Sequence, residues 1–315
     1  MLTMTTFHRL YTTDAPLTIT GVLMAAALIP ALAGLWLDPR VITGAPAWLK
    51  PAKFAMSTAI YVLTLAWIFT YLPEWVRTRR IVGWATAVIL IVEVGAIYVQ
   101  AWRGTTSHFN VGTPLDAALF AAMGIGIVMQ LLASVAVAVA LWRQRFGDAA
   151  LGWALRLGLT VSIVGASTGG LMTKPTAAQR ADARATHRMP VAGAHTVGAP
   201  DGEPGLAGTG WSLSHGDLRV PHFLGLHAMQ VLPVVALLLT RRRRSDARAV
   251  RLTFVAAGSY FALFALLLAQ ALSGESVAAP SPAFLSGFTI WAAATAITAA
   301  GAARSTKHRF DAVIA

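Results

Sequence analysis

The chain contains no cysteine among its 315 residues. This absence excludes disulfide bonds, thiolate metal sites, iron–sulfur clusters and cysteine nucleophiles. Charged residues are also scarce, at 12% of the chain, whereas a soluble domain carries about 25%. The low charged fraction argues against a soluble protein and directs attention to the apolar segments.

Apolar residues make up 56% of the chain, and the mean hydropathy is +0.63. Several apolar runs reach the length of about 18 residues or more that a helix needs to cross a hydrocarbon core of about 30 Å. The runs do not alternate apolar with polar residues, as the strands of a membrane barrel do. The sequence therefore predicts an all-α, polytopic membrane helix bundle with about eight transmembrane helices.

Residues 1–315 are interpreted as a single transmembrane domain. The predicted spans are 16–36, 53–72, 81–102, 117–142, 150–172, 221–240, 250–272 and 283–303. Seven spans is the alternative count, because the last run is rich in Ala and Thr. The first run is longer than the apolar region of a signal peptide, which has about 7–15 residues, so we interpret it as a retained anchor.

Basic residues outnumber acidic ones by 25 to 13. Basic residues concentrate in the cytoplasmic loops of membrane proteins, and here they gather in alternate loops, at 77–80, 143–145 and 241–248, and near both ends. This bias predicts a bacterial-type inner (plasma) membrane protein with both termini in the cytoplasm. An anionic-lipid site at 241–248 is the alternative interpretation of that run. No nucleic-acid partner is expected, because no soluble domain remains to bind one.

The same orientation places the long loop 173–220 on the extracytoplasmic side of the membrane. Its first part is Ala-rich and predicts a short helix through Arg188, whereas its Gly-, Pro- and Ala-rich middle predicts irregular or mobile structure. A stripe of small residues in span 150–172 (Gly158, Ser162, Gly165 and Gly169) is typical of close helix packing. Such packing can lie within the fold or join protomers, so a homo-oligomer through this span is a further hypothesis.

Polar side chains inside a membrane are costly and invite a functional interpretation. At 1.5 Å per residue, Glu93, His227, Gln130 and Gln230 all fall in the outer half or near the midplane. This asymmetry predicts an outward-facing polar pocket. Glu93 and His227 lie at similar depth, and we interpret them as a catalytic, proton-handling pair, since histidine transfers protons near neutral pH.

The entrances of the spans add positive charge from Lys53, Arg103 and Arg219, which suits an anionic headgroup, phosphate or carboxylate. Together with Gln130 and Gln230, these residues form the predicted substrate-binding set. The leading hypothesis is a membrane-embedded enzyme that acts on a lipid-like or quinone-like substrate. The alternative is a non-enzymatic transport, sensing or ligand-binding protein that uses the same pocket, with membrane lipid or an anionic small molecule as its partner.

Histidines raise the question of a cofactor. His222 and His227 are five residues apart, which separates them by about 140° around a helix, so they are not expected to chelate one ion. The predicted set for a zinc-like transition metal is instead His108, Asp217 and His222. A single haem b ligated through His227 is a further alternative.

Overall fold

The computed structural model describes residues 4–240 and 247–304. It contains helices α1 (Met4–Thr13), α2 (Ala15–Leu37), α3 (Leu49–Phe69), α4 (Val76–Trp102), α5 (Pro114–Arg143), α6 (Ala149–Ser167), α7 (Gly169–Met172), α8 (Ala177–Thr186), α9 (Arg219–Thr240), α10 (Ala247–Leu272) and α11 (Pro282–Arg304). Two small antiparallel pairs join β1 (Val41–Ile42) to β2 (Ala45–Pro46) and β3 (Thr196–Val197) to β4 (Gly216–Asp217). The basic run 241–244 and the basic residues after Arg304 lie outside the described residues.

The prediction of an all-α, multi-pass bundle is confirmed. Within residues 4–240 and 247–304, eight helical segments are long and apolar enough to cross a membrane. Seven of these segments begin and end within five residues of the predicted spans, whereas the fifth, Ala149–Thr186, extends beyond the predicted 150–172. Many large apolar side chains on the outside of these helices are exposed, as expected where a protein faces lipid: Ile29, Leu32, Ile81, Ile125, Leu132, Ile290 and Ile297.

Local sequence signals explain where several helices begin. The Asp14 carboxylate accepts the backbone N–H of Leu17 at the start of α2, and the Thr113 hydroxyl accepts that of Asp116 at the start of α5. In each case a proline follows in the first turn, where its missing N–H costs no helical hydrogen bond. Asp148 caps α6 in the same way, through the N–H of Leu151.

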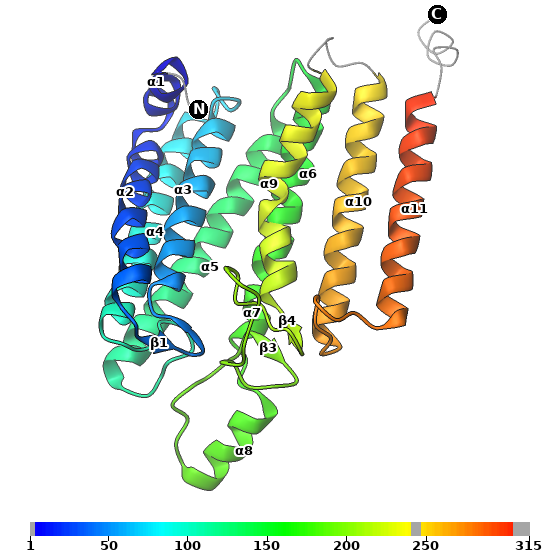
Figure 1. Ribbon diagram of the computed structural model, residues 1–315. Helices are drawn as coiled ribbons and strands as arrows, with labels where there is room; N and C mark the ends of the chain where they lie inside the picture. Colours follow the sequence, from blue (N-terminus) through cyan, green and yellow to red (C-terminus); the bar gives the residue numbers. More distant parts are fainter. Residues whose placement is uncertain (1–3, 241–246, 305–315) are drawn as a thin grey trace, which may run out of the picture.

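The bundle consists of two groups of helices that pack side by side (Figure 1). Helices α2, α3 and α4 pack together on one side, α5 connects α4 to α6, and α6, α9 and α10 form the other side. Helix α11 packs on α10 at the edge of the molecule. Helix α1 and the end of α11 lie at the same end of the bundle, which we call the open end.

Helices α6 and α9 approach each other most closely at two glycines. A side-chain carbon added to Gly165 would lie only 2.5 Å from the Cα of Gly225, and the reverse distance is also 2.5 Å. Ser162, one turn earlier, donates to the backbone oxygen of Leu226 over 3.0 Å. The predicted small-residue stripe therefore packs within the chain, whereas the homo-oligomer stays a prediction.

Loops cover the opposite end of the bundle (Figure 1). We call this layer the cap and define it as residues 38–48, 103–113, 173–218 and 273–281. The cap contains the predicted short helix, here α8, which begins at a capping box formed by Thr176 and Gln179 and ends at Thr186. The rest of loop 173–218 contains the short strands β3 and β4 and irregular segments, and many side-chain hydrogen bonds fix its course.

Candidate functional site

Glu93 is the most unusual buried group in the bundle. It lies in α4, nine residues before Trp102, or about 13 Å below the cap at 1.5 Å per residue. The residue is only 3% exposed. Both carboxyl oxygens are shielded from solvent, and neither has a hydrogen-bond partner among the described residues. An unpaired polar group at this depth destabilises the fold, so its presence calls for a functional explanation.

The side chain nearest to Glu93 comes from the cap. Nε2 of His108 lies 3.4 Å from Oε1 of Glu93. The two groups are close enough for an ion pair, but their alignment is not that of a hydrogen bond, which leaves the carboxyl unpaired. Nδ1 of His108 lies 3.1 Å from the hydroxyl of Ser107. The neutral imidazole therefore presents a proton to Glu93 in the tautomer protonated at Nε2 and a lone pair in the tautomer protonated at Nδ1.

Three phenylalanines surround the His108 ring. The ring centroids of Phe54, Phe109 and Phe120 lie 5.8, 6.2 and 6.4 Å from that of His108. Burial among these rings, together with the positive charge of Lys50, lowers the pKa of His108 well below its ordinary value. His108 is therefore a neutral imidazole at physiological pH, which is the form that accepts a proton.

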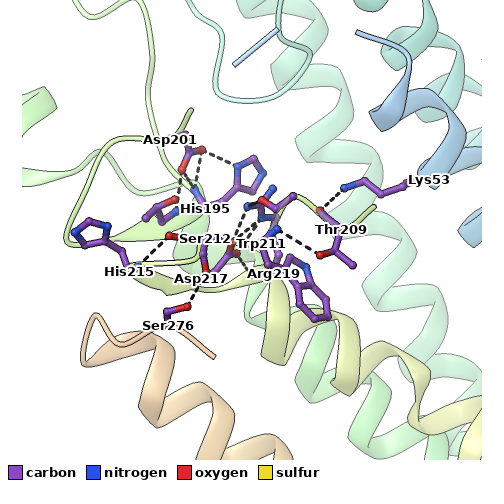
Figure 2. Close-up of polar contacts among 12 residues, drawn as sticks. Lys53, His195, Asp201, Thr209, Trp211, Ser212, His215, Asp217, Arg219 and Ser276 are labelled. Atoms are coloured by element: carbon purple, nitrogen blue, oxygen red, sulfur yellow. Dashed lines mark hydrogen bonds and ion pairs between the residues drawn. The ribbon is translucent and has the colours of Figure 1, made fainter. Parts of the chain in front are cut away.

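Lys50, in the first turn of α3, completes this cluster. It lies within electrostatic range of Glu93 and His108, and its Nζ lies 5.8 Å from the centre of the Phe54 ring. No hydrogen bond or ion pair reaches this ammonium group from residues 4–240 or 247–304. Lys53, one turn further along, differs because its Nζ donates to the backbone oxygen of Thr209 over 2.7 Å (Figure 2). We call Lys50, Glu93 and His108 the buried cluster.

A histidine–carboxylate pair organises the cap beside this cluster. Nδ1 of His195 lies 2.7 Å from Oδ2 of Asp201, whose carboxylate also accepts the backbone N–H groups of His195 and Thr196 (Figure 2). Burial alone would raise the pKa of Asp201, but these hydrogen bonds hold it below the ordinary value. Burial lowers the pKa of His195, so the pair consists of an ionised acid and a neutral imidazole.

Asp217 and Arg219 anchor the cap at the start of α9. Nη2 of Arg219 lies 2.6 Å from Oδ2 of Asp217 and donates to the backbone oxygen of Gly210 (Figure 2). The Asp217 carboxylate also accepts the backbone N–H of Ser212. Every strong hydrogen-bonding position on this buried carboxylate is thus filled by protein groups.

The three cations predicted to bind substrate are engaged in such contacts. Arg103 pairs with Asp116 over 2.5 Å and also donates to Gln100. Arg219 is held by Asp217, and Lys53 by the oxygen of Thr209. These cations fasten the cap to the bundle in this structure, and their role toward a substrate stays a prediction.

The predicted contact between Glu93 and His227 is wrong. His227 packs on Phe223, with ring centroids 4.3 Å apart, whereas the histidine beside Glu93 is His108. Both residues do lie deep in their helices, as predicted, but equal depth does not place them on facing surfaces. The histidine within ion-pair distance of Glu93 comes from a loop instead of from α9, and a proton-handling role for either histidine stays a prediction.

The predicted metal set is also not assembled. His108 faces Glu93, Asp217 pairs with Arg219, and Nδ1 of His222 lies 2.9 Å from the oxygen of Gly165. No group of three or more acidic or histidine side chains suited to a metal occurs in the described part of the chain. The three side chains do not converge, because each one contacts a different partner.

The two predicted glutamines both contact α3, deeper than the cluster. Nε2 of Gln130 donates to the hydroxyl of Tyr61 over 2.9 Å, and Nε2 of Gln230 donates to that of Thr64 over 3.4 Å. The oxygen of each amide is buried and has no hydrogen-bond partner among the described residues. Gln130 and Gln230 thus each keep one unused acceptor, and their predicted role in substrate binding stays a prediction.

The predicted outward-facing pocket is closed over Glu93 in this structure. Packing of Ala96, Ile97 and Met123 against Phe54 and Leu119 fills the space beside this part of α4. Two surface hollows in the described part of the chain lie at the open end, one around Glu74–Thr78 and the other between Asp14, Arg79 and Trp84. A ligand that contacts the Glu93 carboxyl must therefore displace side chains or part of the cap, whereas the His108 side chain is 22% exposed.

Sequence reasoning placed His108 and Lys50 in the outer loops but not beside Glu93. The signal that could have found them is the density of polar groups in the two segments flanking spans two and four.

Comparison with family models, with curated proteins and with solved structures finds no match to this chain. The site is therefore interpreted from its own chemistry.

Proposed function

We propose that this multi-pass membrane protein is a membrane-embedded enzyme that acts on a lipid-like or quinone-like substrate, with Glu93 and His108 as its proton-handling pair. The observation that carries the proposal is the unpaired carboxyl of Glu93, 3% exposed and 3.4 Å from a neutral imidazole. Perturbed, partnerless ionisable groups gather at functional sites because catalysis needs them there and stability does not.

The pair suits general acid–base chemistry. A carboxyl group and an imidazole within hydrogen-bond reach of one another can pass a proton to or from a substrate oxygen, which contributes about 10²- to 10⁴-fold in rate. The aromatic rings of Phe54, Phe109 and Phe120 reduce the contact of the His108 ring with water. The apolar surroundings favour a substrate with a hydrocarbon part and a small polar head.

We further propose that the cap faces outward from a bacterial-type inner membrane and that both termini are cytoplasmic. The support is the charge of the loops: Arg77, Arg79, Arg80, Arg143 and Arg145 lie near the open end. The positive-inside rule places such loops in the cytoplasm.

Infrared spectroscopy of the protein in lipid nanodiscs tests the function. We expect a carbonyl band of the protonated Glu93 carboxyl that shifts on addition of decylubiquinone or of lysophosphatidylglycerol. The response to each compound distinguishes a quinone-like substrate from a lipid-like one. The shift should be absent in Glu93→Gln and retained in Glu74→Gln, a matched control on an exposed loop.

Turnover is tested by mass spectrometry of lipid extracts after incubation with the wild-type protein or with Glu93→Gln. A lipid or quinone consumed only by the wild type would support an enzyme. A band shift without any turnover would assign the non-enzymatic binding or sensing alternative. If neither probe shifts the band and no compound is consumed, the proposed function is wrong.

A further inference from the structure

Lysine is rare in this chain, and its distribution is uneven. The chain has 21 arginines but only four lysines, which are Lys50, Lys53, Lys174 and Lys307. Arginine cannot lose its proton in a protein, whereas a lysine amine can do so and then becomes a nucleophile. Two of the four lysines, Lys50 of the buried cluster and Lys53, occur together in the first two turns of α3.

The amino groups of the two lysines of α3 make different contacts. Nζ of Lys53 is held by the oxygen of Thr209. Nζ of Lys50 has no hydrogen bond or ion pair with the described residues and lies over the Phe54 ring. Lys50 is also the residue within electrostatic range of both Glu93 and His108. An amine, an acid and a neutral base thus meet in one apolar site, and neither the amine nor the acid makes a hydrogen bond with the described residues.

We propose that Lys50 is a nucleophile that binds its substrate covalently, as an iminium formed with an aldehyde or ketone group on the amphiphilic substrate. This inference rests on the proposed function and specifies the reactive group of the substrate. Glu93 is the proton donor and then the counterion, and His108 carries protons between nitrogen and oxygen.

The step is balanced within the buried cluster. The Lys50 ammonium group first gives its proton to solvent, and the neutral amine then attacks the carbonyl carbon while the carbonyl electron pair moves to oxygen. His108 transfers one proton from nitrogen to that oxygen, which gives a carbinolamine. Glu93 then protonates the hydroxyl, which leaves as water while the nitrogen lone pair forms the C=N bond. A neutral amine and a neutral acid become an iminium cation and a carboxylate, and hydrolysis reverses the sequence.

Reductive trapping tests the proposal on the full-length protein in nanodiscs. The probe is decanal with sodium cyanoborohydride, and peptide mass spectrometry locates the alkylated lysines. Lys174 is exposed and serves as the internal reference. We expect Lys50 to be labelled about a hundredfold faster than Lys174, the lower end of what a positioned proton donor contributes. Lys53 is expected to react no faster than the reference, because its nitrogen is engaged.

Glu93→Gln separates this proposal from a simpler role for Lys50. If Glu93 donates the proton, the variant lowers Lys50 labelling toward the rate of Lys174. If Lys50 is only a counterion of Glu93, the wild type reacts slowly and the variant, which frees the amine, reacts faster. His108→Asn should also lower the rate of Lys50 labelling. Size-exclusion chromatography checks that each variant is folded.

Labelling of Lys50 at the rate of Lys174 in the wild type, or faster labelling in Glu93→Gln, would overturn the proposal. Either result leaves the proposed function standing if the carbonyl band of Glu93 still responds to ligand and turnover is still observed. Conversely, trapping at Lys50 without a response to decylubiquinone or lysophosphatidylglycerol would support the nucleophile and reject those two substrate classes.

Discussion

Replacement of Glu93 by methionine is expected to stabilise the protein and to abolish its function. Methionine has a similar volume and a flexible, apolar side chain, so it fills the site of Glu93 at little packing cost. The substitution removes a carboxyl group whose two oxygens are buried without a hydrogen-bond partner among the described residues. An unsatisfied buried polar group costs about 1–3 kcal/mol, and we expect a gain of that size.

Titration with sodium dodecyl sulfate in mixed micelles measures this change. Unfolding is followed by circular dichroism, and the free energy of unfolding of each variant is compared by linear extrapolation. Asp217→Asn is the matched control, because that carboxylate is equally buried but fully hydrogen-bonded. Loss of its charge weakens the pair with Arg219, which is partly exposed, so we expect destabilisation by about 1–3 kcal/mol.

The two variants should therefore move in opposite directions. Destabilisation of Glu93→Met by more than about 1 kcal/mol, the net value of a typical hydrogen bond, would refute the reasoning. It would mean that Glu93 is paired in the folded protein, for example through water to Lys50, and that its burial has a structural explanation. Stabilisation with retained turnover would instead reject Glu93 as the catalytic acid.

The remaining predictions concern packing, pH and orientation. Gly165→Leu should destabilise the protein by about 1–3 kcal/mol in the same titration, because its side chain would meet Gly225, whereas Gly95→Leu, which meets nothing within 4 Å, should be close to neutral. Burial and the charge of Lys50 lower the pKa of His108 in the folded protein. The contribution of His108 to the free energy of unfolding should therefore be complete at a pH above its unfolded pKa of about 6.5. At lower pH this contribution should decrease by up to about 1.4 kcal/mol per pH unit. His108→Asn should flatten that pH dependence in part, since His195 contributes in the same sense; an unchanged slope would contradict this. Because the chain has no cysteine, Ala207→Cys in the cap should react with an impermeant maleimide on intact cells and Glu74→Cys should not, and the reverse pattern would invert the proposed orientation.

The fold could be predicted from the sequence because a lipid environment leaves few choices. A run of about 20 apolar residues must satisfy its backbone hydrogen bonds internally and therefore forms a helix. The caps at Asp14, Thr113 and Asp148 are also local signals that can be found without tertiary contacts. The close approach of Gly165 to Gly225 could be predicted only in part. The small residues of span 150–172 indicate a close helix contact, but they do not identify the helix that makes it.

The candidate site could be predicted only as far as helical geometry reaches. The rise per residue gives the depth of Glu93 and of His227, because both lie in continuous helices. It gives nothing for His108, whose depth depends on how segment 103–113 folds back over the bundle. That course is set by contacts distant in sequence: Val111 donates to the oxygen of Pro190, and the oxygen of Phe109 accepts from Ala192.

The backbone at Phe109 shows how strongly these contacts override local preference. Its φ is 63°, in the left-handed region, which costs about 1–2 kcal/mol for a residue with a side chain. No glycine at this position announces the turn. The buried Phe109 ring packs on Phe120 and on His195, with centroids 5.8 and 4.9 Å apart, and this packing offsets the strain. The same turn brings the neighbouring His108 to Glu93, so the conformation that sequence reasoning could not foresee is the one that builds the site.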